Sequence, residues 1–286
     1  MDPFKNPFSP GAGSIPPELA GRQQVLSMAE ASCARSISGR SARSLMMLGL
    51  RGTGKTVLIG EMRRIGEQRG LLVTQIEAPE GDSLGRMLLP AMHKVLRSLS
   101  TIEDAKHVVD RGLRALRSFA SVFKLETGGV PISVAPEPGL ADSGDIEYAL
   151  PDLFEEIGRA AQAAGKGWLL LIDEVQYLSP GDLSALIVAL HRASQRGLPI
   201  VFGGAGLPQV ARLAGDAKSY AERLSHYPAI GALAADAAED AVRKPIASEG
   251  ALITDDALQV IVQQTYGYPF FLQEWGSFAW NTASGN

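Results

Sequence analysis

The sequence predicts an α/β protein built in three layers, with helices on both faces of a parallel sheet. Short apolar segments alternate with helical ones from about residue 44 to residue 202, which is typical of strand–helix–strand units. Residues 168–172 are a continuous apolar run, as in a central parallel strand buried on both faces. After about residue 233 only helical patterns follow, so a smaller helical part completes the predicted architecture.

The composition is that of a globular chain. Its 286 residues are 45% hydrophobic, and 27 Lys and Arg face 31 Asp and Glu for a net charge of −4. These values exclude wholesale disorder, and the mild acidity argues against a surface built entirely for nucleic acid. The single cysteine, Cys33, can form no internal disulfide. We find no apolar segment of the length of a membrane span and no signal-like start, so we expect a cytoplasmic protein without a membrane partner.

In the first half of the chain, helices and strands are predicted from apolar patterns and from the glycines and prolines that interrupt them. The prolines of residues 3–17 predict an extended, unpacked arm. Gly39 is a natural stop for the helix after that arm, and glycine closes the first apolar run. The predicted elements are a helix over 17–38, strands over 44–50 and 71–76, a helix beginning near Val57, and helices over 84–100 and 103–124.

The second half begins with glycines and prolines between residues 128 and 139, which predict an irregular or hairpin stretch. The next helix has Pro151 near its first turn, and Thr254 is the expected N-cap of a later one. The remaining elements are a strand over 168–172, a helix over 182–195 and a strand over 199–202 closed by Gly203 and Gly204. We divide the chain into an arm (1–20), an α/β domain (21–232, with an insertion over about 101–145) and a helical lid (233–286).

A phosphate-binding loop is predicted between the first strand and its helix. Residues 49–56 fit G-x-x-x-x-G-K-[ST], and Val57 follows in the helix. The glycines allow successive N–H groups to face phosphate oxygens, and the helix N-terminus adds its partial positive charge. Lys55 would reach the β- and γ-phosphates. The nucleotide-binding residues expected here are Gly49, Leu50, Arg51, Gly52, Thr53, Gly54, Lys55, Thr56 and Val57.

Two acids follow the buried strand over 168–172. The strand delivers Asp173 to the carboxyl edge of the sheet, where ligands bind in open α/β folds. We expect Asp173 and Thr56 to hold Mg²⁺, and Glu174 to orient and polarise the attacking water. The alternative is a strand that ends in a solvated acidic turn. The complete phosphate loop in the same chain favours the metal and water site.

The sequence resembles AAA+ ATPases, in particular the branch of STAND signalling and archaeal or bacterial replication-initiation-like ATPases. The passages that carry the resemblance are residues 18–22, 49–56, 171–178 and 266–272. The resemblance implies a three-layer P-loop NTPase fold with a C-terminal helical lid, and ATP or ADP with Mg²⁺ as ligands. It also implies that Gly21 and Arg22 lie against the adenine and that Gly267 and Pro269 are lid contacts to the nucleotide.

By the same resemblance, Arg223 is a candidate arginine finger with a catalytic role beside Lys55 and Glu174. Such a finger often comes from a neighbouring subunit, which would imply a homo-oligomer. The alternative is an arginine that binds carbonyls or water at a helix end. The sequence departs from the family at the strand over 199–202, which runs into glycines where a γ-phosphate sensor usually stands; Gln209 is the nearest polar candidate. The lid turn also lacks an arginine, and Arg243 and Lys244 lie elsewhere.

These observations predict a Mg²⁺-dependent ATP-binding protein that acts as a slow ATPase or a nucleotide-driven switch. Two alternatives stay open: an interaction module with a structural nucleotide, and a DNA-associated initiator-like ATPase. Arg111, Arg114 and Arg117 form one side of a predicted helix, either as a solvated face or as a contact to nucleic acid. The overall charge does not support DNA as a partner, and the protein partner is not identified by the sequence.

Overall fold

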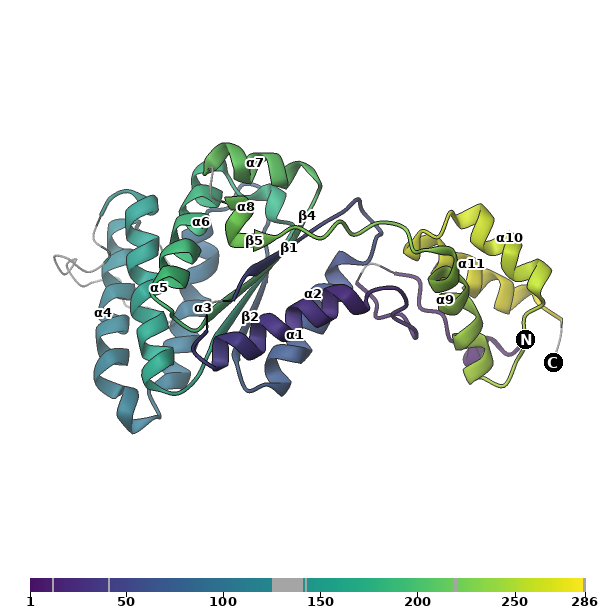
Figure 1. Cartoon of the computed structure of the whole chain (residues 1–286), viewed down its shortest axis with the longest axis horizontal. Helices are drawn as coiled ribbons and strands as arrows, with labels where there is room; N and C mark the ends of the chain where they lie inside the picture. The colour runs from purple at the N-terminus through teal and green to yellow at the C-terminus, as the bar shows by residue number, and fades with distance from the viewer. Residues whose placement is uncertain (12, 41, 125–140, 142, 219–220, 285–286) are drawn as a thin grey trace. The chain divides into compact units, whose positions relative to one another are not determined.

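A computed structural model describes residues 1–11, 13–40, 42–124, 141, 143–218 and 221–284 (Figure 1). The chain forms two compact units. One contains residues 28–48 and 59–228 and is called the sheet unit here. The other contains residues 1–27, 49–58 and 229–286 and is called the loop–lid unit. No helix of the described residues is long and apolar enough to cross a membrane.

The sheet unit is built on five parallel strands in the order β2-β3-β4-β1-β5. The predicted parallel α/β fold is therefore confirmed. β3 lies between β2 and β4, and every one of its residues is buried. The strands are β1 (Ser44–Leu48), β2 (Leu72–Glu77), β3 (Trp168–Asp173), β4 (Ile200–Gly206) and β5 (Ser225–His226).

Side chains of β3 alternate between two helical layers, as a period of two requires. Trp168 packs on Phe154 of α5, with ring centroids 5.2 Å apart, and its indole N–H donates to Thr74 Oγ1 at 3.0 Å. Leu169 faces the other way, where an added Cβ at Gly66 of α2 would come within 2.5 Å of its side chain. The predicted three layers are confirmed by this alternation.

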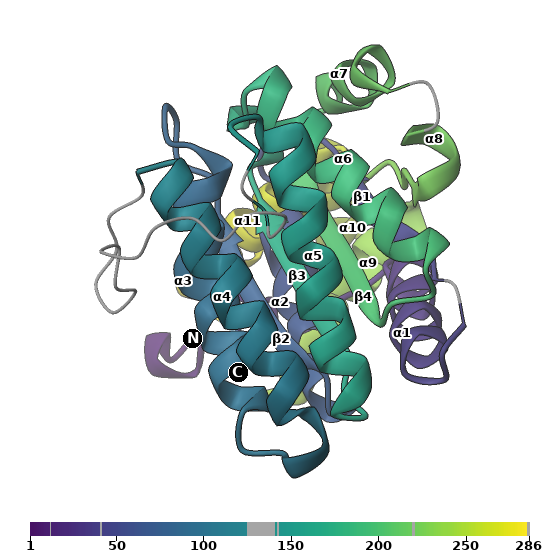
Figure 2. The ribbon, with the colours of Figure 1, turned by 90° about the vertical axis from the view of Figure 1, so that its left-hand side faces the viewer.

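One helical layer consists of α3, α4, α5 and α6, which lie side by side in Figure 2. Pro151 lies inside α5 rather than near its first turn, because Asp145 caps the helix earlier by accepting from Glu147 N at 2.8 Å. The bounds of the first six α-helices in the described residues are α1 (Gln23–Ile37), α2 (Lys55–Gln68), α3 (Leu84–Leu99), α4 (Lys106–Val122), α5 (Ile146–Ala163) and α6 (Pro180–Gln195). Short turns η2 (Glu103–Ala105) and η3 (Val175–Tyr177) and helices α7 (Gln209–Ala217) and α8 (Ala221–Leu224) complete the unit.

β4 continues through the glycines that were expected to end it. Gly203 and Gly204 are buried strand residues paired with β3 and β1. A Cβ at Gly203 would lie 2.6 Å from the Met62 side chain, and one at Gly204 would lie 2.7 Å from Met46. The glycines are therefore sites of close packing within the strand, and the predicted strand end at residue 202 is wrong.

α1 begins at Gln23, later than the predicted residue 17, and stops before Gly39 as expected. Gly21 has a φ of +67°, which interrupts a helix at that point. Cys33 lies fully buried in α1. Burial raises the pKa of its thiol to about 11, with Glu30 adding to the rise and Arg69 opposing it.

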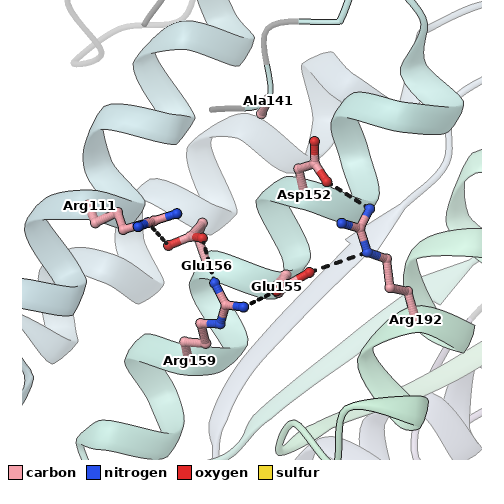
Figure 3. A pocket seen from close by; sticks show the side chains of 7 residues that line it. All are labelled: Arg111, Ala141, Asp152, Glu155, Glu156, Arg159 and Arg192. Atoms are coloured by element: carbon pink, nitrogen blue, oxygen red, sulfur yellow. Dashed lines mark hydrogen bonds and ion pairs between the residues drawn. The ribbon is translucent and has the colours of Figure 1, made fainter. Parts of the chain in front are cut away.

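A network of ion pairs joins α4, α5 and α6 around a cavity of about 250 Å³ (Figure 3). Buried Glu155 contacts Arg159, Arg192 and Arg196, with Arg192 Nε 3.2 Å from Glu155 Oε2. Buried Glu156 is contacted at Oε2 by Arg111 Nε at 2.9 Å and at Oε1 by Arg159 Nη1 at 3.0 Å. Arg111 is thus committed to a structural ion pair.

The arginine row and the irregular stretch that the sequence predicts both concern this region. Arg114 makes a noncovalent contact with another residue. Half-buried Arg117 lies near His93, and the pKa of His93 is lowered by burial and by the charges of Arg97 and Arg117. With Arg111 paired to Glu156, the expected arginine row is not a uniformly solvated face. The predicted irregular stretch between residues 128 and 139 lies outside the described residues.

The loop–lid unit contains three helices with their own core: α9 (Ala235–Ser248), α10 (Asp255–Thr265) and α11 (Pro269–Thr282). Thr254 caps α10 as predicted and accepts from Ala257 N at 3.3 Å. The N-terminal arm, which starts with the turn η1 (Pro3–Lys5), packs on α11. Phe8 is only 5% exposed and lies against Gly276, and the Trp280 indole N–H donates to Asp2 O at 2.8 Å. The expectation of an unpacked arm is wrong, because Phe8 supplies an apolar anchor.

The charge on Glu155 should matter for stability. Glu155→Gln leaves three arginines without their shared buried counter-charge, and we expect the free energy of unfolding to fall by about 2–3 kcal/mol in urea denaturation. Asp152→Asn is the control, since Asp152 is 37% exposed and, among the described residues, its ion pair is with Arg192. That variant should lose no more than about 1 kcal/mol. Equal losses in both variants would contradict the network's role.

Candidate functional site

The phosphate loop, residues 49–56, follows β1 and ends in the first turn of α2, as predicted. Gly52 has a φ of +77° and Gly54 a φ of +91°, values that L side chains rarely adopt. A Cβ at Gly49 would lie 2.1 Å from Ile230 O, so no other residue fits at that position without movement. Val57 is buried in α2 directly after the loop, whereas the Thr56 side chain is exposed.

Five consecutive carbonyls of the loop accept hydrogen bonds. Leu50 O accepts from Thr53 Oγ1 and Lys55 Nζ, both at 2.9 Å. Arg51 O accepts from Tyr268 Oη at 2.7 Å, and Gly52 O accepts from Phe270 N at 3.2 Å. Two further bonds complete the set, Arg22 Nη2 to Thr53 O at 3.1 Å and Leu58 N to Gly54 O at 3.1 Å. The protein itself therefore fixes the carbonyl side of the loop.

Arg22 joins the loop to the segment that leads into the lid helices. Its Nη2 donates to Gly231 O at 2.6 Å as well as to Thr53 O. The side chain is 9% exposed, and this burial lowers the pKa of the guanidinium. Gly21, the residue before it, packs on α9, where an added Cβ would lie 2.9 Å from Ala237 Cβ. The structure thus brings Gly21 and Arg22 to the phosphate loop and the lid helices.

The turn between α10 and α11 contacts the phosphate loop directly. Gly267 has a φ of +68°, and its carbonyl accepts from Leu233 N at 2.8 Å. Pro269 occupies the first turn of α11, where a missing N–H costs nothing. Its neighbours Tyr268 and Phe270 make the contacts to the loop, and sequence reasoning did not single them out. Their aromatic character beside the Gly-x-Pro turn was the available signal.

Asp173 and Glu174 lie at the carboxyl end of β3 in the sheet unit. Asp173 is 5% exposed, and its Oδ1 accepts from Glu174 N at 2.8 Å. Glu174 has left-handed backbone angles, φ 54° and ψ 40°, a conformation that costs a non-glycine residue about 1–2 kcal/mol. Such strain persists where the surrounding structure over-determines it, and it clusters at functional sites. Here it turns the chain sharply at the end of the strand.

Arg223 is exposed in α8, just before β5. The candidate residues therefore fall into two sets. The loop, Gly21, Arg22, Gly267 and Pro269 belong to the loop–lid unit, while Asp173, Glu174 and Arg223 belong to the sheet unit.

The described residues contain no group of three or more His, Cys, Asp or Glu side chains that could hold a metal ion. The two predicted magnesium ligands are of a suitable kind, since the Thr56 hydroxyl and the Asp173 carboxylate are hard oxygen donors. Magnesium at phosphate sites keeps most of its coordination for water and phosphate oxygens, so two protein donors fit its chemistry.

A glycine-rich loop at a helix start, placed after a buried parallel strand, defines a P-loop nucleotide-binding protein. Comparison with protein families agrees, since the model of the AAA ATPase domain matches residues 18–202. The chain belongs to this family, and the predicted AAA+ class is confirmed. No curated protein matches the sequence.

Solved structures share the fold at low sequence identity. The Walker-type ATPase of Pyrococcus abyssi is 16% identical with a TM-score of 0.52, over 92% of this chain and 68% of that one. Cdc6p of Pyrobaculum aerophilum is 17% identical with a TM-score of 0.55, over 98% and 66%. A RuvB variant of Thermotoga maritima is 13% identical with a TM-score of 0.51, over 92% and 62%. The chain thus spans about two thirds of the length of these proteins.

A substitution at Gly267 tests the contact between the turn before α11 and Leu233, which precedes α9. Gly267→Ala places a Cβ about 2.5 Å from Leu233 O at a positive φ. We expect it to cost at least about 2 kcal/mol, seen as a lower Tm by circular dichroism. The control is Gly215→Ala in α7, where a Cβ meets open space. That change should leave Tm unchanged or slightly raised. A Gly267→Ala protein as stable as the wild type would refute the turn geometry.

Proposed function

We propose that the chain binds ATP with Mg²⁺ and hydrolyses it slowly, using the binding energy to change the state of its helical lid. The observation that carries this proposal is the phosphate loop with all five carbonyls from Leu50 to Gly54 engaged by the protein. With the carbonyl oxygens held in this way, the loop can present its amide N–H groups and the N-terminus of α2 to an anion.

Each residue of the proposed site has a role that its chemistry supports. Lys55 Nζ donates to Leu50 O in this structure, and we propose that it exchanges this carbonyl for the β- and γ-phosphate oxygens. Thr56 and Asp173 would hold Mg²⁺, which neutralises phosphate charge when bound. Glu174 would orient the attacking water and accept its proton.

The lid segment, residues 233–286, would respond to the nucleotide through the phosphate loop. Arg22 and Gly21 lie at the loop, and Tyr268 and Phe270, which flank Pro269, bond to its carbonyls. A phosphate that moves the loop would therefore act on these contacts, a hinge-type coupling. Adenine as the base rests on the family resemblance alone.

We also propose that Arg223 acts as an arginine finger for a second copy of the chain. Its exposure at the end of α8 supports this role, because a guanidinium that stabilises a transferring phosphoryl group in trans must reach outward.

Lys55→Ala tests the binding half of the proposal. The loss of a buried ammonium opposite phosphate should weaken ATP binding at least about thirtyfold in isothermal titration calorimetry. Lys94→Ala removes an exposed lysine of α3 as the matched control and should leave the affinity unchanged. Wild-type affinity in Lys55→Ala would remove the phosphate-loop assignment.

Glu174→Gln tests the catalytic half. The amide cannot accept the proton of the attacking water, so kcat should fall about 10²–10⁴-fold while ATP still binds. Phosphate release with Mg²⁺ measures kcat, and Glu249→Gln, on the exposed end of α9, should keep it. Full turnover in Glu174→Gln would mean another base. No turnover in the wild-type chain with ATP bound would instead favour a structural or switching nucleotide.

A further inference from the structure

The side chain of Gln176 spans the gap between Glu174 and the end of β4. Gln176 belongs to η3, the turn directly after β3. Its Nε2 donates to the Glu174 carboxylate, and its Oε1 accepts from Leu207 N at 3.1 Å. All three residues lie in the sheet unit. Both ends of one amide are thus used to connect two neighbouring strands.

The partners fix the orientation of this amide. A backbone N–H can only donate, so Leu207 must face the Gln176 oxygen. An ionised carboxylate can only accept, so Glu174 must face the NH₂ group. An amide flipped by 180° would lose both hydrogen bonds. The Glu174 and Leu207 contacts therefore each require the same orientation of the Gln176 amide.

The glycine at the end of β4 makes room for Gln176. A Cβ at Gly206 would lie 3.1 Å from Gln176 Oε1 and 3.0 Å from Val210 Cγ2. Gln209, the nearest polar candidate for a γ-phosphate sensor in the sequence, is exposed at the start of α7. The polar side chain that is hydrogen-bonded at the end of β4 is Gln176, from the turn after β3.

The backbone and the side chain of Glu174 are held by different hydrogen bonds. The left-handed turn is fixed by the bonds of Glu174 N to Asp173 Oδ1 and of Tyr177 N to Glu174 O. Among the described residues, Gln176 is the hydrogen-bond partner that the Glu174 carboxylate has. The orientation of that carboxylate thus depends on the amide.

We infer that Gln176 is a positioning residue that holds the carboxylate of Glu174 and couples it to the end of β4. The inference rests on the proposed role of Glu174. One carboxylate oxygen is bound by the amide, which leaves the other for the attacking water. A displacement of about 1 Å in such a group can cost about a hundredfold in rate.

Gln176→Glu separates this role from a merely structural one. The variant keeps the size of the side chain and an oxygen for Leu207 N, but it replaces the donor with a carboxylate that repels Glu174. We expect kcat for ATP to fall at least about tenfold. KM and the Kd for ATP should stay within about twofold of the wild type, while the repulsion between the two carboxylates lowers Tm by only about 2–4 °C. A residue that only braces β4 would keep its kcat in this variant.

Two further variants complete the experiment. Gln176→Met loses both hydrogen bonds, and we expect it to lower kcat and Tm together. Gln162→Glu makes the same chemical change at an exposed position near the end of α5 and should keep wild-type kcat. Unchanged kcat in Gln176→Glu overturns the inference, as does an equal loss in Gln162→Glu or a loss of ATP binding in Gln176→Glu. Absent turnover in the wild-type chain overturns the proposed hydrolysis itself, which the Gln176 variants alone cannot do.

Discussion

The buried guanidinium of Arg22 is the contact on which the loop–lid unit depends most. It holds Thr53 O in the phosphate loop and Gly231 O in the segment that leads to the lid helices. Burial makes a guanidinium costly unless it is hydrogen-bonded, so the two carbonyls and the cation stabilise one another. The remaining loop carbonyls are held by Lys55, Thr53 and the start of α11. The shape of the loop is therefore set by segments from both ends of the chain.

In the sheet unit, the acids after β3 lie beside the end of β4, where the strand itself consists of glycine and alanine. Gly206 leaves space for the Gln176 side chain, which contacts both Glu174 and Leu207 N. The left-handed turn at Glu174 follows Asp173 directly at the end of β3. The glycines of β4 thus serve two purposes. Gly203 and Gly204 let the adjacent methionine and leucine side chains pack closely, and Gly206 admits an amide.

Local patterns were sufficient to predict β1, β2, β3 and the start of β4, the glycine-rich loop after β1 and the acids after β3, because each is encoded by adjacent residues. The end of β4 was missed because its glycines are explained by Met62 and Met46, which are distant in sequence. The contact of Gln176 with Leu207 depends on the pairing of β3 with β4 and has no local signal. Likewise, Phe8 packs on Gly276, a partner at the other end of the chain, so the prolines around it misleadingly indicated an unpacked arm.

The burial of Cys33 has a practical consequence for the study of motion. The thiolate is the form that reacts with maleimides, and a pKa of about 11 leaves very little of it at neutral pH. Because the sequence has no other cysteine, the native chain should be nearly silent toward such reagents. A cysteine introduced on the surface of each compact unit could then carry a pair of fluorophores or spin labels. The separation of the two units could be followed with and without nucleotide, without first removing the native thiol.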